Sequence, residues 1–172
     1  VSQQVDVTAP DGAIMARGKH HQSYLLTQTS GRVALRDPRS KEGVRRFKVP
    51  EGEAINSVTR RIDLEMCGRF FHGNASYHTD KGAAEALGFD DVVVGGRMTM
   101  SYIGDLLDRR FGKGWYEGGT LDIKFTNIVW PEDVVVAKGM ITGRTEENGK
   151  GRATVTVWME KDDGTVVIVG SA

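Results

Sequence analysis

Apolar residues recur along the chain with two different periods, and the change of period marks the predicted elements. Between Arg97 and Arg110 the apolar positions lie three or four residues apart: Met98, Tyr102, Ile103, Leu106 and Leu107. This spacing places them on one face of a helix of about four turns. The pattern therefore predicts one long amphipathic helix in the middle of the chain.

After residue 119 apolar and polar residues alternate, which is the period of a strand. Within 120–129, Leu121, Ile123 and Phe125 alternate with polar residues. Further strands are predicted at 54–60, 134–145, 151–161 and 165–170, with turns at 147–149 and 162–164. Successive strands joined by tight turns pair antiparallel. We expect an α+β fold in which this sheet cradles the long helix.

Two short helices are expected before the long one. Asp63 is placed as the N-cap of a helix that runs to about residue 71, and Asp80 as the N-cap of a helix over 81–87. Between these helices lies a polar turn centred on His78.

The first fifty residues carry few large apolar groups. The elements expected there are a loose lead-in at 1–12, a small hairpin from 21–26 and 32–35, and a short strand at 45–49. A segment so poor in core residues is better suited to lie on another surface than to fold alone. We therefore divide the chain into an arm, 1–52, and a domain, 53–172.

Composition narrows the classes of function. In 172 residues, 23 lysines and arginines balance 23 aspartates and glutamates, so no global field favours nucleic acid or an anionic membrane. No apolar run approaches the ~20 residues of a membrane span, and the N-terminal residues lack a secretory apolar region. A single cysteine, Cys67, fits a reducing compartment. We expect a cytoplasmic protein with no membrane or nucleic-acid partner, no metal site and no cofactor.

His78 is the first residue suited to acid–base chemistry. An imidazole titrates near neutrality, so it can take or give the proton that water addition or removal requires. The same ring can instead hydrogen-bond the loop or cap the helix at Asp80. The residue pattern leaves both interpretations open.

Gly95 and Gly96 directly precede the long helix. The first N–H groups of a helix lack internal partners and the helix dipole favours negative charge there, so a thioester oxygen can be stabilised as it becomes an enolate. A plain turn is the commoner use of paired glycines, and the pair alone decides nothing.

Four further residues flank these two elements. Asn74 and Asp80 can orient a water or the imidazole, Tyr77 adjoins the histidine, and Arg97 can meet a carboxylate or phosphate. Each such residue more often serves as a solvated surface group.

The motifs at 77–80 (YHTD), 83–89 (AAEALGF) and 94–99 (VGGRMT), with the closing strand at 164–170, resemble the MaoC-like (R)-specific enoyl-CoA hydratases and dehydratases. The resemblance covers about residues 53–172. It implies the hot-dog fold, an antiparallel sheet wrapped round one long central helix. It also implies a homodimer or a higher assembly of dimers, an active site near the subunit interface, and an acyl-CoA or acyl-carrier thioester as the substrate.

The resemblance also assigns roles to residues. The catalytic histidine falls on His78 and the oxyanion glycine on Gly96, with Tyr77, Gly95 and Arg97 expected beside the substrate. The family's catalytic aspartate, five residues before the histidine, falls on Gly73, which cannot accept a proton. Three alternatives follow: His78 is the sole acid/base and Asn74 places the water, Asp80 is recruited, or hydration activity is lost.

Two main hypotheses therefore stand. The first is a hydratase or dehydratase that reversibly adds water to the enoyl group of an acyl thioester. The second is a non-catalytic acyl-thioester-binding or scaffolding domain, which the missing aspartate favours. A third, thioesterase activity, would need a carboxylate on the central helix, and the spacing of Asp105 and Asp108 from Leu106 and Leu107 places both in solvent.

Overall fold

The computed structural model describes residues 1–21 and 47–172. The chain divides into two compact units, Val1–Val33 and Ala34–Ala172, and each is described by itself. The expected hairpin at 21–26 and 32–35 falls almost entirely outside the described residues, as does the start of the strand expected at 45–49. The described remainder of that strand, residues 47–49, has no regular secondary structure.

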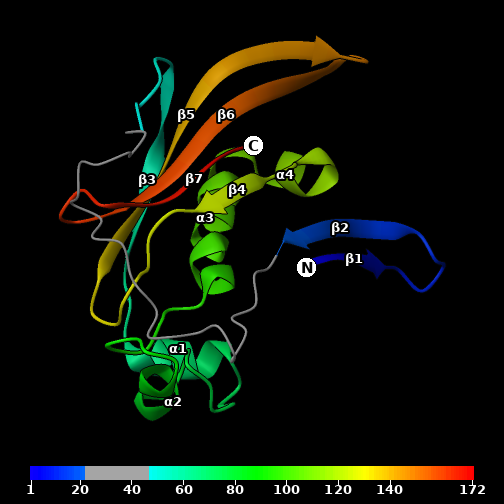
Figure 1. Cartoon of the computed structure of the whole chain (residues 1–172). Coiled ribbons are helices and arrows are strands. Elements are labelled where there is room, and N and C mark those ends of the chain that lie inside the picture. Colours follow the sequence, from blue (N-terminus) through cyan, green and yellow to red (C-terminus); the bar gives the residue numbers. More distant parts are fainter. Residues whose placement is uncertain (22–46) are drawn as a thin grey trace. The chain divides into compact units, whose positions relative to one another are not determined.

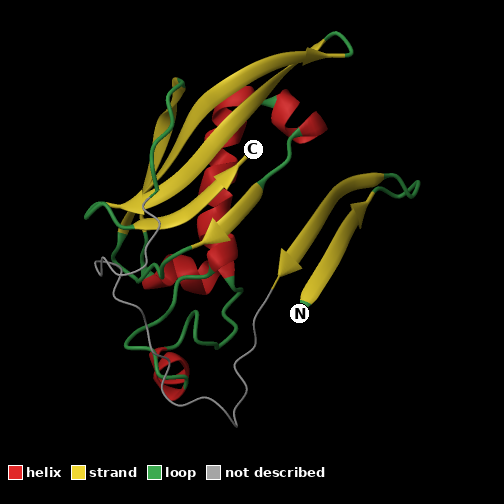
Figure 2. Ribbon diagram, turned by 45° about the horizontal axis from the view of Figure 1, so that its top comes forward, coloured by secondary structure: helices red, strands yellow, loops and turns green. Residues whose placement is uncertain are grey.

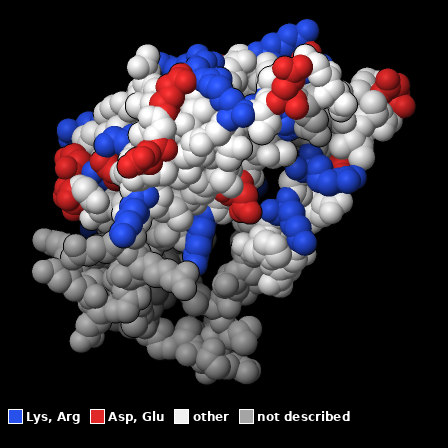
Figure 3. Space-filling model, turned by 90° about the horizontal axis from the view of Figure 1, so that it is seen from above, with Lys and Arg blue, Asp and Glu red and all other residues white. Residues whose placement is uncertain are grey.

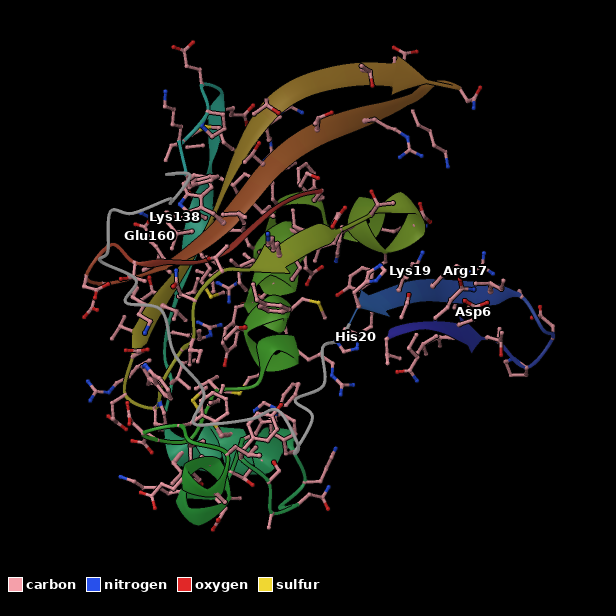
Figure 4. The ribbon with its side chains drawn as sticks, viewed as in Figure 1. Asp6, Arg17, Lys19, His20, Lys138 and Glu160 are labelled. Atoms are coloured by element: carbon pink, nitrogen blue, oxygen red, sulfur yellow. The ribbon has the colours of Figure 1, made fainter. Side chains whose placement is uncertain are left out.

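The first unit contains a β-hairpin. Strands β1 (Ser2–Thr8) and β2 (Ile14–His21) pair antiparallel. The Asp6 carboxylate accepts two hydrogen bonds from the Arg17 guanidinium across the pair, at 2.8 and 2.9 Å, and Figure 4 shows the two side chains facing each other. The expectation of a loose lead-in was therefore wrong, because the turn after Thr8 brings two alternating segments into register.

The second unit is built on a five-stranded antiparallel sheet with the order β3-β5-β6-β7-β4 (Figure 1). Its strands are β3 (Glu53–Arg61), β4 (Asp122–Phe125), β5 (Val134–Glu147), β6 (Lys150–Lys161) and β7 (Val166–Ser171). Strands β5, β6 and β7 follow one another through tight turns, as their alternation predicted. The preceding strand, β4, crosses over to pair with the far side of β7.

The long helix α3 (Gly96–Phe111) lies against this sheet (Figure 2). Its apolar face supplies Met98, Ile103, Leu106 and Leu107 to the core, all at most 3% exposed. The strands contribute Ile55, Val58, Val135, Ala137, Ile141, Val155, Val157, Met159, Val167 and Ile168. Each fully buried leucine or isoleucine stabilises the fold by roughly 1.5–3 kcal/mol. The predicted α+β arrangement of sheet and helix is confirmed.

The two short helices begin where the sequence predicted. In α1 (Leu64–Phe70) the Asp63 carboxylate accepts from the Met66 N–H at 2.7 Å, and in α2 (Lys81–Ala86) the Asp80 carboxylate accepts from the Ala83 N–H at 2.7 Å. Both aspartates are N-caps that satisfy amides left unpaired at a helix start.

Two elements differ from expectation. A further helix, α4 (Lys113–Gly118), follows α3. Its glycines lower intrinsic helix propensity, and it is retained because Trp115 packs against the core. Strand β4 has four residues instead of ten. The Thr126 N–H still donates to the Val167 carbonyl, and the side chains Thr126 Oγ1 and Asn127 Nδ2 both donate to the Val166 carbonyl.

Among the described residues, no helix combines the length and the apolar character needed to cross a membrane. On the face drawn in Figure 3, basic and acidic side chains are interspersed over the surface.

Candidate functional site

Helix α1 ends at its C-cap, Phe71, and two left-handed residues follow, His72 with a φ of +55° and then Gly73. Gly73 has a φ of +72°, and its N–H donates to the Gly68 carbonyl at 2.9 Å. Such a left-handed residue after a helix is the place where glycine avoids the strain of a side chain. At the position of the family's aspartate, this chain therefore holds a left-handed glycine two residues after the C-cap of α1.

The His78 side chain is fixed by a hydrogen bond. Its Nδ1 lies 2.7 Å from the carbonyl oxygen of Val93. Because a carbonyl only accepts, Nδ1 carries the hydrogen, and in the neutral ring Nε2 is left with a free lone pair. The backbone strengthens this link, since the Val93 N–H donates to the Tyr77 carbonyl at 3.0 Å. His78 is thus poised to accept a proton at Nε2.

Aromatic rings contact both sides of this imidazole. The Phe71 ring stacks on it with a centroid distance of 4.8 Å and an angle of 7°. The Tyr77 ring lies 3.9 Å away, tilted by 39°. Stacking and the Nδ1 bond together define the plane of the ring, and with it the direction of the Nε2 lone pair.

The start of α3 lies next to the same aromatic group. A Cβ at Gly95 would lie 2.7 Å from Cε2 of Phe71, so this ring packs directly against the glycine backbone. A Cβ at Gly96 would lie 3.0 Å from Cζ of Phe125. Any larger residue at 95 would displace Phe71 from its place against His78.

The N-terminus of α3 retains unpaired donors. Gly95 is the N-cap and makes no side-chain capping bond, and the amides of Met98 and Thr99 both donate to its carbonyl. The Gly96 N–H has no acceptor among the described residues. With the helix dipole behind it, this amide is suited to an oxygen that gains negative charge.

The structure therefore brings two of the expected residues into one neighbourhood. His78 is bonded to Val93, three residues before Gly96, and the Phe71 ring contacts both the imidazole and Gly95. Tyr77 belongs to the same group through its ring. The imidazole and the α3 amide lie on one side of the domain, at the N-terminal end of α3.

Of the remaining expected residues, Asn74 and Asp80 make local hydrogen bonds, and Arg97 makes none with the described residues that fixes its place. Asn74 donates from Nδ2 to the Phe71 carbonyl at 2.9 Å, which leaves its Oδ1 as an acceptor. Asp80 has one carboxylate oxygen engaged by the Ala83 N–H. Arg97 is exposed in the first turn of α3.

The family model described as a MaoC-like domain matches residues 73–163, more than half of the chain. The chain belongs to the MaoC-like family. A comparison with curated protein sequences finds no match.

Solved structures place this MaoC-like chain in the hot-dog fold. The (R)-hydratase from A. caviae involved in PHA biosynthesis is 20% identical, with a TM-score of 0.58, over 72% of this chain and 94% of the hydratase chain. The MaoC-like dehydratase from Rhodospirillum rubrum is 18% identical, with a TM-score of 0.59, over 72% of this chain and 90% of that chain. The R-hydratase from Pseudomonas aeruginosa is 15% identical, with a TM-score of 0.57, over 72% and 79%. At these identities the likeness shows the fold, and it confirms the predicted hot-dog architecture.

Sequence reasoning missed Phe71, Val93 and Phe125 as members of the site. Val93 acts through its backbone, which no side-chain pattern can reveal. The two phenylalanines read as ordinary apolar positions of a helix and a strand. The paired Gly95 and Gly96 were the available signal, because paired glycines indicate that other groups approach the backbone closely.

Within 1–21 and 47–172, no three His, Cys, Asp or Glu side chains are grouped so that they could hold a metal ion. Burial raises the pKa of the Cys67 thiol, which disfavours the reactive thiolate.

A cavity of about 400 Å³ lies at the opposite end of α3, beside Leu107, Phe111 and Trp115. Helix α3 has 16 residues and is therefore about 24 Å long at 1.5 Å per residue. This length separates the cavity from the N-terminus of α3. The cavity is therefore not part of the His78 neighbourhood, which lies at the N-terminal end of α3.

Proposed function

We propose that this protein is a hydratase or dehydratase that adds water reversibly to the enoyl group of an acyl thioester. The observation that carries the proposal is the 2.7 Å contact between His78 Nδ1 and the Val93 carbonyl. It leaves Nε2 as a base and ties the imidazole to the segment that leads into α3. Membership of the MaoC-like family supports the same class of reaction.

The proposed mechanism uses one acid/base group. In hydration, Nε2 of His78 takes a proton from water as the water oxygen forms a bond to C3 of the enoyl group. The electrons of the C2=C3 bond move towards the thioester carbonyl, whose oxygen becomes an enolate and accepts a hydrogen bond from the Gly96 N–H. The imidazolium then returns its proton to C2. Dehydration runs through the same steps in reverse.

The other site residues have supporting roles in this proposal. The free Oδ1 of Asn74 orients the attacking water, which an amide can do although it cannot act as a base. Tyr77, Gly95 and Arg97 line the thioester. Asp80 is an unfavourable replacement for the missing aspartate, because removing its carboxylate from the Ala83 N–H would leave the start of α2 uncapped.

The substrate is proposed to be an acyl-CoA or an acyl-carrier thioester, bound by a homodimer. Chains related by fold occur in complexes, such as the ChsH1–ChsH2 complex from Mycobacterium tuberculosis. Analytical ultracentrifugation of the purified protein tests the dimer, and a monomer at the concentrations used in the assay would contradict it.

A second candidate function is acyl-thioester binding without chemistry. It is favoured by the rings of Phe71 and Phe125, which pack on Gly95 and Gly96, and by the absence of a carboxylate at Gly73. Such a protein would be stabilised by an acyl-CoA that it does not convert, because a ligand that binds only the folded state raises its stability.

The decisive experiment compares the wild type with His78→Gln on a chain-length series of 2-enoyl-CoA substrates. Glutamine retains hydrogen-bonding capacity but cannot take the proton, so we expect kcat to fall by about 10²–10⁴-fold. Thermal unfolding of both proteins controls for folding. Equal rates in the two proteins would contradict the role of His78. If the wild type binds every substrate of the series without turnover, the result would support the second function, acyl-thioester binding without chemistry.

A further inference from the structure

Phe125, the last residue of strand β4, lies beside the first residue of α3. A Cβ built on Gly96 would be 3.0, 3.1 and 3.3 Å from Cζ, Cε1 and Cε2 of the Phe125 ring. These three atoms form one end of the ring, so the ring turns its edge towards the Gly96 backbone. Ile123, two residues earlier on the same face of β4, packs against the core. Phe125 is therefore directed to the α3 side of the sheet.

The Phe125 ring approaches α3 separately from the ring of Phe71. Phe71 stacks on His78, and among the ring contacts of the described residues none joins Phe125 to either of them. Beyond Phe125 the chain stays close to the start of α3, because the Val94 N–H donates to the Val129 carbonyl at 3.0 Å. The start of α3 thus lies between two walls, one with Phe71 and His78 and the other with Phe125.

The Phe125 ring has free surface at this place. Its residue is 46% exposed, although it lies on the α3 side of β4. Gly96 is only partly buried, and its N–H donates to no acceptor within the described chain. A group that accepts a hydrogen bond from Gly96 would therefore also cover part of an exposed aromatic ring.

The proposed reaction determines which part of a thioester meets this ring. The carbonyl oxygen accepts from the Gly96 N–H, and C2 and C3 lie towards Nε2 of His78, which has to exchange a proton with them. The carbonyl carbon is trigonal, so its remaining bond, to sulfur, points away from C2. Because Phe125 and His78 belong to different walls, this bond points to the wall that contains Phe125.

From this geometry we propose that Phe125 is a specificity-determining residue that contacts the sulfur of the thioester. Sulfur is polarisable and makes favourable contacts at the edge of aromatic rings, and the edge is the part of the Phe125 ring that faces Gly96. The oxygen of an ordinary ester is smaller and less polarisable, so the site prefers a thioester to the corresponding ester. Because this role rests on the function proposed for His78 and Gly96, its test does not depend on turnover.

Isothermal titration calorimetry with the full-length protein compares two ligands that differ in one atom. They are butanoyl-CoA and its analogue in which oxygen replaces the thioester sulfur, and both lack the C2=C3 bond that the proposed reaction needs. We expect the wild type to bind the thioester more tightly than the ester. Phe125→Leu keeps apolar bulk without a ring, and should reduce the ratio of the two affinities about two- to tenfold.

Phe70→Leu is the matched control. Phe70 is 39% exposed and its ring contacts that of Phe71, so this variant loses a comparably exposed ring from the other wall and should keep the wild-type ratio. Thermal unfolding checks that both variants are folded. Because the wild type is itself compared on the two ligands, the proposal is testable even without a folded Phe125→Leu protein.

Three results would overturn the role of Phe125. They are equal binding of the two ligands by the wild type, no binding of the thioester, and a loss of affinity in Phe125→Leu that is the same for both ligands, as a purely structural ring would give. Turnover of 2-butenoyl-CoA by the wild type tests the reaction separately. Turnover with an unchanged affinity ratio would keep the reaction and reject the sulfur contact, whereas a changed ratio without turnover would keep the contact and reject the reaction.

Discussion

At the residue scale, Phe71 connects the parts of the candidate site. Its ring is parallel to the His78 imidazole and lies against the backbone of Gly95. Phe71 is the C-cap of α1, and the left-handed His72 and Gly73 turn the chain directly after it. The glycine that replaces the family's aspartate and the ring that orients the histidine are therefore consequences of one helix end.

Replacing Phe71 with leucine tests this connection. Leucine keeps most of the apolar volume but cannot stack on the ring. The His78 side chain can then rotate more freely, and its Nε2 lone pair is no longer held in one direction. We expect kcat to fall by about ten- to a hundredfold with KM changed much less, because misplacement of a reacting group acts on the chemical step. Steady-state kinetics with an enoyl-CoA accepted by the wild type measures both constants.

Phe70→Leu is the matched control for that variant. Phe70 touches the Phe71 ring edge-on at 5.2 Å and is 39% exposed. Kinetic constants altered equally in the two variants would show that general loosening of α1, and not stacking on His78, explains the effect.

At the scale of elements, α3 is fixed to the sheet by charge as well as by its buried face. Asp105 accepts a hydrogen bond from Arg60 of β3 at 2.9 Å and from Arg109, one turn along α3, at 2.7 Å. The bond from Arg109, with the positive charges of Arg109 and Arg60, lowers the pKa of the Asp105 carboxyl. Asp105, one of the two carboxylates on α3 considered for thioesterase activity, therefore already has a structural role.

The lowered pKa predicts how stability depends on pH. Because the folded pKa of Asp105 lies below the unfolded value of about 3.9, its contribution is present above that pH and is lost as the pH falls through the folded pKa. Asp105→Asn should lower the free energy of unfolding by about 0.5 kcal/mol at pH 7, which is typical of partly exposed ion pairs. The difference from the wild type should shrink at pH 3.

Urea unfolding at the two pH values measures this difference, with Asp108→Asn as the control on the same helix. A difference between Asp105→Asn and the wild type that is the same at pH 3 and pH 7 would show that the ionised carboxylate is not what stabilises α3.

At the scale of the whole molecule, the division into an arm, 1–52, and a domain, 53–172, remains a prediction. The described structure gives it one specific test. Phe47 lies before the predicted boundary, yet its ring packs on Trp158 of β6 with a centroid distance of 5.3 Å. The domain therefore uses at least one aromatic contact from the predicted arm.

Two fragments examine this boundary. We expect 34–172 to unfold cooperatively close to the melting temperature of the full chain, because it is one compact unit. Fragment 53–172 should also unfold cooperatively, but a few degrees lower, since an aromatic pair contributes about 0.5–1.5 kcal/mol. Differential scanning calorimetry measures both. A fragment 53–172 without a cooperative transition would move the boundary of the domain to before Phe47.

The sequence by itself determined the elements whose signal is local. The spacing of Met98, Ile103 and Leu106 predicted α3, alternation predicted β5 to β7, and Asp63 and Asp80 predicted two helix starts, because period and capping act within a few residues. It also predicted the MaoC-like family and the hot-dog fold. Only the tertiary structure decided the crossover of β4, the retention of α4 and the surroundings of His78. Those depend on contacts between residues far apart in the chain, such as Trp115 with the core and Phe71 with Gly95, for which the local pattern carries no signal.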